Sequence, residues 1–148
     1  MPSSAVEIIH KLTGDDPTPD DAFERFFSWY EDYWLMNDDL VGTLDSMPRP
    51  LREVVVTHQA FGYMSSEAPS GYYIRFESVF DGEVELGMVQ LGFSDSASTL
   101  SEGRRLYESS DHGNLTLEQD SEIYGRLPAL EDVEDRIGRW LIEQVNKA

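Results

Sequence analysis

The side chains of this sequence that could do chemistry are mainly carboxylates, and their excess over basic residues is largest in its first third. Carboxylates can bind cations, exchange protons in catalysis, or present a negative surface to a basic partner. Eleven acidic residues precede residue 49, against only Lys11 and Arg25, so this segment has a net charge of −9. The candidate binding residues are the clustered acids of this segment: Asp15, Asp16, Asp20, Asp21, Glu24, Glu31, Asp32, Asp38 and Asp39.

The charge of the remaining chain is more evenly balanced. The 148 residues include 29 acidic and 11 basic ones, a formal net charge of −18, of which residues 49–100 contribute −4 and residues 101–148 contribute −5. Binding to nucleic-acid phosphates requires clustered Lys and Arg, and anionic membranes attract basic segments. The composition therefore excludes nucleic acid as a direct ligand and disfavours a membrane surface. It leaves a basic protein partner, or acidity that serves solubility.

Motifs for catalysis and for metal binding are absent from the sequence. No cysteine is present, which excludes a thiol nucleophile, a thiolate metal site and a disulfide scaffold. The three histidines have no ligand spacing, and the sequence contains neither a G-x-S-x-G elbow nor a glycine-rich phosphate loop. The acid pairs at 15–16 and 38–39 could ligate a hard cation, but they lack the spacing of a calcium loop. We expect no cofactor, no metal and no enzymatic activity.

The histidines have simpler expected roles. His58 lies among apolar residues, which predicts a structural position in the core, and His112 lies in a polar segment, which predicts a solvated side chain. An enzyme would instead need a pocket in which carboxylates and His58 converge with perturbed pKa values.

The acids of the first third must be positioned by two predicted helices. The first covers about residues 6–12 and ends at the Gly and Pro of residues 13–17. The second begins with Thr18 as N-cap and Pro19 as first residue, and it extends to Met36. Its expected buried stripe is aromatic: Phe23, Phe26, Phe27, Tyr30 and Trp34. The acids at 21, 24, 31 and 32 project beside this stripe, as a solvated face or as a recognition surface.

The rest of the chain also has helical spacing. We predict a turn at 37–39, a helical turn at 40–44, and helices over about 50–65, 72–76, 84–91, 95–107, 117–125 and 129–146. The predicted boundaries are a break at 68–71, a turn at Asp81-Gly82, a stop at Gly92, an N-cap at Ser94 or Asp95, and a capping box beginning at Thr116. The fold class is therefore all-α, a single compact domain (1–148) of about six to eight helices. With no apolar stretch of bilayer length and no basic, apolar leader, we expect a cytoplasmic protein.

One part of the sequence resembles a known family. The pattern consists of His58 to Met64, Ser70 to Glu77, the Asp81-Gly82-Glu83 step, and Leu91-Gly92-Phe93 before the next helix. Over residues 51–107 it resembles the domain-of-unknown-function family whose best-known member is a bacterial DNA-mimic protein. The chain departs from that family at Ser70-Gly71, where a double glycine is usual, at Pro69, and at Tyr72, where phenylalanine is usual.

The resemblance implies an all-helical fold and a capacity to form homodimers. It also implies that acidic side chains imitate DNA phosphates and occupy the basic surface of a DNA-binding protein, such as a transcription factor. Two other interpretations stay open. In one, the chain is a non-catalytic regulatory protein whose acidity serves solubility, and in the other it is an immunity-type protein that neutralises a basic toxin nuclease.

Overall fold

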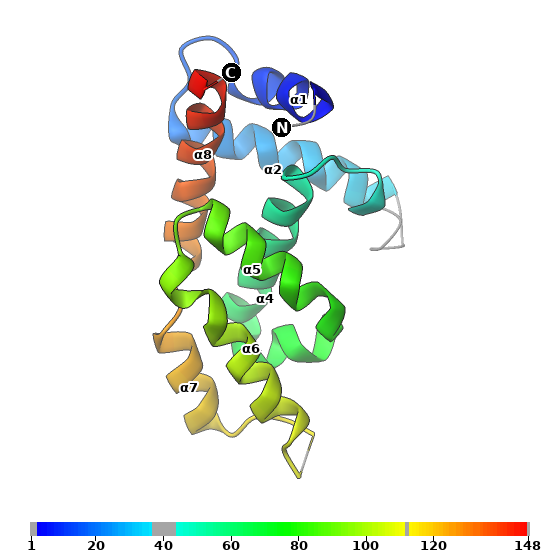
Figure 1. Cartoon of the computed structure of the whole chain (residues 1–148), viewed down its shortest axis with the longest axis vertical. Coiled ribbons are helices and arrows are strands. Elements are labelled where there is room, and N and C mark those ends of the chain that lie inside the picture. Colours follow the sequence, from blue (N-terminus) through cyan, green and yellow to red (C-terminus); the bar gives the residue numbers. More distant parts are fainter. Residues whose placement is uncertain (1–2, 37–43, 112, 148) are drawn as a thin grey trace. The chain divides into compact units, whose positions relative to one another are not determined.

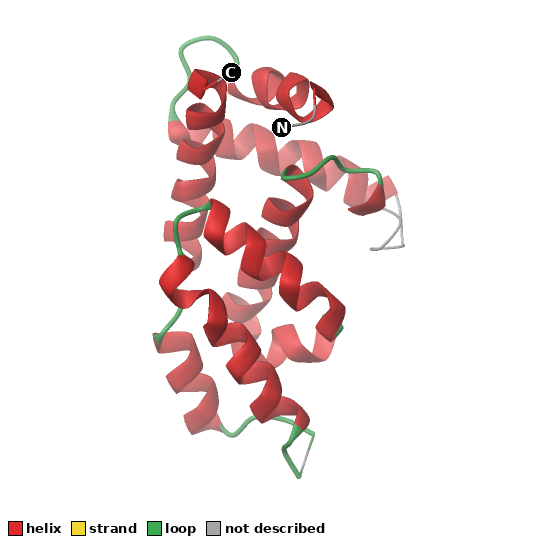
Figure 2. Ribbon diagram, in the orientation of Figure 1, coloured by secondary structure: helices red, strands yellow, loops and turns green. Residues whose placement is uncertain are grey.

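The computed structural model describes residues 3–36, 44–111 and 113–147, and the side chains of this part except those of Ser3 and residues 33–36. All its regular elements are helices (Figure 2), which confirms the all-α prediction. No helix of the described residues is long and apolar enough to cross a membrane. The predicted turn at 37–39, residues 40–43 of the next predicted turn, and His112 lie outside the described residues.

Figure 1 shows the helices in the order in which they follow one another along the chain. They are α1 (Ser3–Thr13), α2 (Pro19–Met36), α4 (Leu51–Arg75), α5 (Asp81–Gln90), α6 (Ser94–Glu108), α7 (Leu117–Gly125) and α8 (Leu130–Lys147), with a 3-10 helix, η1 (Ser78–Phe80), before α5. The backbone divides into two compact units: unit 1 comprises residues 1–55 and 134–148, and unit 2 comprises residues 56–133.

Helix α2 of unit 1 begins as predicted. The hydroxyl of Thr18 accepts a hydrogen bond from the backbone N–H of Asp21 at 3.2 Å, which satisfies one free donor of the first turn. The buried stripe is narrower than predicted, because Phe26 and Tyr30 are fully buried whereas Phe23 and Phe27 are only half-buried. The stripe is centred on Ala22, Phe26 and Tyr30, at spacing i, i+4, i+8, so the neighbouring rings lie at its edge.

Helix α4 is helical despite three consecutive valines. Val54, Val55 and Val56 favour strands by propensity, but all three are fully buried in this helix. His58 is buried too, at 5% exposure, as predicted. Glu53 and Thr57 are also buried, so the helix is covered on more than one side and tertiary packing determines its conformation.

The predicted break at 68–71 is confirmed at Ala68 as a kink within α4, whereas residues 69–71 are helical. Ala68 has φ 64° and ψ 173°, outside the helical region, and Pro69 follows it. Pro cannot continue a preceding helix, but it fits the first position of a new one. The helical segments on either side of the kink are therefore Leu51–Glu67 and Pro69–Arg75.

Two other predicted helix ends are confirmed. Gly92, with φ 87°, ends α5 in a Schellman motif, since Phe93 N–H donates to the carbonyl of Met88 at 2.8 Å and Gly92 N–H to that of Val89 at 3.1 Å. At α7, the Thr116 hydroxyl accepts from Gln119 N–H at 3.1 Å and the Gln119 side chain accepts from Thr116 N–H at 2.9 Å, which is the predicted capping box.

Two predictions at helix N-termini were wrong: the turn expected before α5 and the side-chain cap expected for α6. Asp81-Gly82, predicted as a turn from its dipeptide signal, is the first turn of α5, because the Asp81 carboxylate is held in a buried network. Neither Ser94 nor Asp95 caps α6, because Phe93 occupies the N-cap position and no side chain caps that helix. At Asp81 the tertiary contacts of the carboxylate outweigh the local turn signal. At α6 the turn that ends α5 at Gly92 and Phe93 leads directly into the next helix, so that Phe93 takes the N-cap position.

A buried ion pair organises unit 2. Arg104 Nε donates to Asp81 Oδ2 at 2.9 Å, and its Nη2 donates to Asp81 Oδ1 at 3.0 Å. The same guanidinium donates to the backbone carbonyls of Tyr73 at 3.1 Å and Phe76 at 2.9 Å, at the end of α4. Its Cζ lies 4.8 Å from the centroid of the Tyr73 ring. Arg104 therefore joins α6, the start of α5 and the last turn of α4, with its donors satisfied.

Two tyrosines share this network. Tyr72 O–H donates to Asp81 Oδ1 at 2.6 Å, and Tyr73 O–H donates to the carbonyl of Leu100 at 2.8 Å. Burial raises the pKa of Tyr72 far above its ordinary value, and the adjacent Asp81 carboxylate raises it further. Burial likewise raises the pKa of Tyr73, with Asp81 again adding to the effect.

Tyr72 and Tyr73 are therefore expected to ionise at a higher pH in the folded protein than in the unfolded chain. The folded state favours the neutral phenols, so their contribution to stability is complete below about pH 10, the unfolded pKa, and is lost as the pH rises above it. In an alkaline titration followed by tyrosinate absorbance, at least two of the seven tyrosines should ionise only together with the loss of helical circular dichroism. A single ionisation step near pH 10 for all seven, with the helices intact, would contradict this.

Candidate functional site: the acidic face of α2

Three of the predicted acidic residues line one open hollow on the exposed side of α2. Its volume is 390 Å³, and the lining residues are Asp21, Glu24, Arg25, Ser28, Trp29 and Asp32. Positions 21, 24, 28 and 32 are spaced by three or four residues, so they follow one face of the helix. The side chains of Asp21, Glu24 and Asp32 are exposed, and we call these three carboxylates the α2 acidic face.

The one basic residue of this hollow is committed elsewhere. Arg25 Nη1 donates to the carbonyl of Thr13 at 2.7 Å and to that of Leu12 at 3.4 Å, both in the last turn of α1. A guanidinium at this position satisfies free carbonyls and complements the negative end of the α1 dipole. Within the described part of the chain, no Lys or Arg lies at ion-pair distance from Asp21, Glu24 or Asp32.

The connection between α1 and α2 keeps Arg25 in place. Gly14 has φ +64°, a left-handed conformation that ends α1, and a Cβ built on it would lie 2.8 Å from Arg25 Nη1. A side chain at position 14 would therefore press on the guanidinium where it caps α1. The glycine and the arginine form one structural unit, and the carboxylates of the hollow are left without a cationic partner.

The other predicted site residues are near in sequence but do not line this hollow. Asp15 and Asp16 are exposed in the connection before α2, Asp20 is exposed in the first turn, and Glu31 is exposed near the end of the helix. Asp38 and Asp39 lie outside the described residues. The structure thus brings together three of the nine predicted residues. No group of three or more His, Asp or Glu in the described residues could hold a metal ion.

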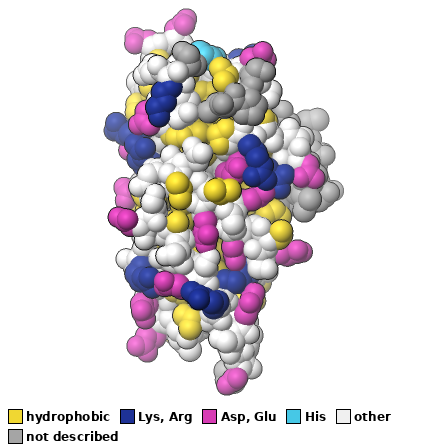
Figure 3. Space-filling model, in the orientation of Figure 1, with side chains coloured by type: hydrophobic (Ala, Val, Ile, Leu, Met, Phe, Trp, Pro, Cys, Tyr) yellow, Lys and Arg dark blue, Asp and Glu magenta, His cyan; other side chains and the backbone are white. Residues whose placement is uncertain are grey.

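Acidic and basic side chains are distributed differently elsewhere. On the face shown in Figure 3, side chains of both signs are interspersed among the described residues. Helix α8 shows the pairing directly, with Arg139 Nε 2.8 Å from Asp135 Oδ2 and Arg136 Nη1 3.5 Å from Glu143 Oε1. The Asp135–Arg139 pair is one that the i, i+4 spacing predicts. The acidic face of α2 is distinguished from this helix by the absence of such pairs.

Sequence reasoning missed two features of the molecule that matter for function and stability. Trp29 and Ser28 line the hollow with the acids, whereas helical spacing alone predicts Trp29 on the other flank of α2, as a core residue or part of a dimer contact. The buried Arg104–Asp81 pair was also missed. Its signal was an arginine on the apolar stripe of α6, because a buried arginine nearly always has a carboxylate partner.

Comparisons with known proteins identify no relative of this chain. No protein-family model, no curated protein and no solved structure matches the chain. The resemblance to the family of the DNA mimic therefore stays a prediction.

Proposed function

We propose that this chain is an acidic protein-binding module, in which the α2 acidic face occupies the basic DNA-binding surface of a partner protein in the manner of a DNA mimic. The observation that carries the proposal is that Asp21, Glu24 and Asp32 form no ion pair with any residue that the structure describes. Their one basic neighbour in the hollow, Arg25, donates instead to carbonyls of α1. Such a surface attracts Lys and Arg groups of a partner and excludes nucleic acid itself.

The density of carboxylates along α2 is similar to that of phosphates along one strand of DNA. Residues 20–32 span about 18 Å of helix axis at 1.5 Å per residue. Five carboxylates stand in this segment, namely Asp20, Asp21, Glu24, Glu31 and Asp32. This amounts to roughly one negative charge per 4 Å, close to the one per 3.4 Å of a single DNA strand. A surface that binds phosphates in sequence would therefore meet a comparable number of charges on α2.

The test is competition for a DNA-binding protein captured by the complete chain. We expect duplex DNA to release the captured protein, and binding to weaken steeply between about 50 and 200 mM salt, since the contacts are ionic. The triple variant Asp21→Asn/Glu24→Gln/Asp32→Asn should weaken binding at least about tenfold, as each tenfold corresponds to about 1.4 kcal/mol. Fluorescence anisotropy with the purified partner measures both effects.

A charge-matched control separates the α2 acidic face from overall acidity. Glu77, Glu108 and Asp111 are exposed outside α2, and the variant Glu77→Gln/Glu108→Gln/Asp111→Asn removes the same three charges. It should bind within about twofold of the unmodified chain. Equal weakening by both triple variants would indicate that net charge alone is responsible. Retention of the partner regardless of DNA and salt would refute the mimic.

A further inference from the structure

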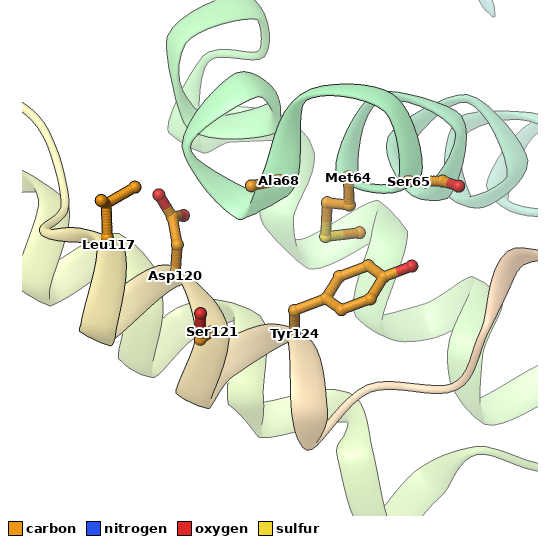
Figure 4. Close-up of a pocket in the computed structure, with 7 residues that line it drawn as sticks. All are labelled: Met64, Ser65, Ala68, Leu117, Asp120, Ser121 and Tyr124. Atoms are coloured by element: carbon orange, nitrogen blue, oxygen red, sulfur yellow. The ribbon is translucent and has the colours of Figure 1, made fainter.

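A second hollow lies in unit 2, between α4 and α7, and the proposed function does not use it. Its volume is 290 Å³ (Figure 4). Its lining comes from three residues of α4 and four of α7: Met64, Ser65, Ala68, Leu117, Asp120, Ser121 and Tyr124. Sites that accept a ligand side chain or a small molecule are commonly concave and mostly apolar, with a few polar groups. This hollow has that composition.

The α4 wall of the hollow is a strained turn of backbone held in place by α7. Ala68 has φ 64°, a conformation that a residue with a Cβ rarely adopts. Asp120 reaches across and accepts hydrogen bonds from Ser70 N–H at 2.9 Å and Ser70 O–H at 2.7 Å, which caps the segment after the kink. The kink in α4 therefore shapes one wall of the hollow, and the hydrogen bonds from Ser70 to Asp120 stabilise the kink.

Apolar surface is left open around this hollow. Leu117 is 87% exposed, the most exposed of the large apolar side chains in the described residues, and Tyr124 is 42% exposed. Met64 is buried at the floor and faces Tyr124 across the hollow (Figure 4). A methionine thioether adapts its shape to an inserted side chain, and exposed leucine and tyrosine at a rim are typical of a contact surface.

The charges near the hollow are mainly negative, which disfavours an anionic ligand. Helix α7 contains Glu118, Asp120 and Glu122 and no basic residue, and Glu118 and Glu122 are exposed. On the α4 side, Glu67 is paired with Arg75, whose Nε lies 2.7 Å from Glu67 Oε2. An anionic ligand would be repelled by α7, and a second copy of this chain would carry its own net charge of −18 to the same surface.

From the kink, the open apolar rim and the acidic helix, we propose that this hollow docks an apolar anchor side chain from a cationic amphipathic segment of a partner protein. The anchor would insert between Met64, Leu117 and Tyr124, and flanking Lys or Arg groups would be attracted by the carboxylates of α7, of which Asp120 lines the hollow itself. This is the arrangement of a helix or turn that lays its apolar face into a groove. The inference does not rest on the proposed function, because none of these residues belongs to α2.

The test uses a synthetic amphipathic helical peptide of lysine and leucine, with a glutamate and leucine peptide of the same pattern as counterpart. Binding to the complete chain is followed by the methyl NMR signal of Met64, assigned with Met64→Leu. We expect a saturable shift with the lysine peptide and none with the glutamate peptide. A Met64 signal unmoved by the lysine peptide, or moved equally by both peptides, would overturn the proposal.

Variants locate the contact. Leu117→Ser removes the exposed rim without disturbing the core, and Ser121→Trp fills the hollow from an exposed position. Each should raise the peptide Kd measured at Met64 at least tenfold. Leu106→Ser, a matched control on α6 that removes another exposed leucine, should leave it within twofold. Equal effects of Leu117→Ser and Leu106→Ser would overturn the assignment.

The α2 triple variant separates this inference from the proposed function. Asp21→Asn/Glu24→Gln/Asp32→Asn should keep the Met64 shift with the lysine peptide, because its substitutions leave the hollow unchanged. Loss of the shift in that variant would overturn the claim that the hollow acts as a separate site. Loss of DNA-binding partners in the α2 variant, with the Met64 shift retained, is the result expected when both proposals hold.

Discussion

Replacing Arg104 by leucine is expected to destabilise the protein by about 3–5 kcal/mol, a large part of the 5–15 kcal/mol that holds a typical domain folded. The substitution leaves the Asp81 carboxylate buried without its ionic partner, and Asp81 is only 8% exposed. It also removes the donors from the carbonyls of Tyr73 and Phe76 at the end of α4. Urea denaturation followed by far-ultraviolet circular dichroism measures the free energy of unfolding.

Two variants make this result specific to the buried network. Arg105→Leu removes a neighbouring arginine that is exposed in the last turn of α6, and it should cost at most about 1 kcal/mol, from the lost interaction with the helix dipole. Arg104→Lys keeps the charge but loses the paired donors, so an intermediate loss is expected. Equal losses for Arg104→Leu and Arg105→Leu would show that Arg104 contributes no more than a surface charge.

Replacing Gly138 by alanine is expected to destabilise unit 1 by about 1–3 kcal/mol. A Cβ at this position of α8 would lie 2.1 Å from the carbonyl oxygen of Pro19 and 2.7 Å from its carbonyl carbon. The obstacle is backbone at the start of α2, which cannot rotate away as a side chain could. The strain should therefore exceed the roughly 1 kcal/mol by which alanine favours a helix over glycine.

Gly62 provides the matched comparison, because it also lies inside a helix. A Cβ at Gly62 would meet nothing within 4 Å, so Gly62→Ala in α4 should stabilise the protein by up to about 1 kcal/mol. The two substitutions are chemically identical and are expected to have opposite signs. Thermal unfolding of both variants tests this, and destabilisation by Gly62→Ala or a neutral Gly138→Ala would refute the assigned cause.

Much of the fold could be predicted because its boundaries depend on local chemistry. The cap at Thr18, the break at Ala68-Pro69, the stop at Gly92 and the capping box at Thr116 each follow from a few adjacent residues. Less of the site could be predicted, because the exposure of an acidic side chain and its ion pairing depend on residues far away in the sequence. The sequence indicated Asp21, Glu24 and Asp32 as exposed acids, but not that they line one hollow with Trp29.

The sequence by itself determined the all-α class, the positions of most helix ends and the large excess of acidic over basic residues before residue 49, since apolar periodicity, capping residues and charge are local properties. Tertiary structure alone decided that Asp81 begins a helix, because Arg104 and Tyr72 hold its carboxylate from 23 and 9 residues away. It also decided that Arg25 serves the end of α1 at Thr13, 12 residues earlier in the chain. A side chain's partner depends on which distant segments pack against it, and among the described residues that arrangement leaves Asp21, Glu24 and Asp32 without an ion pair.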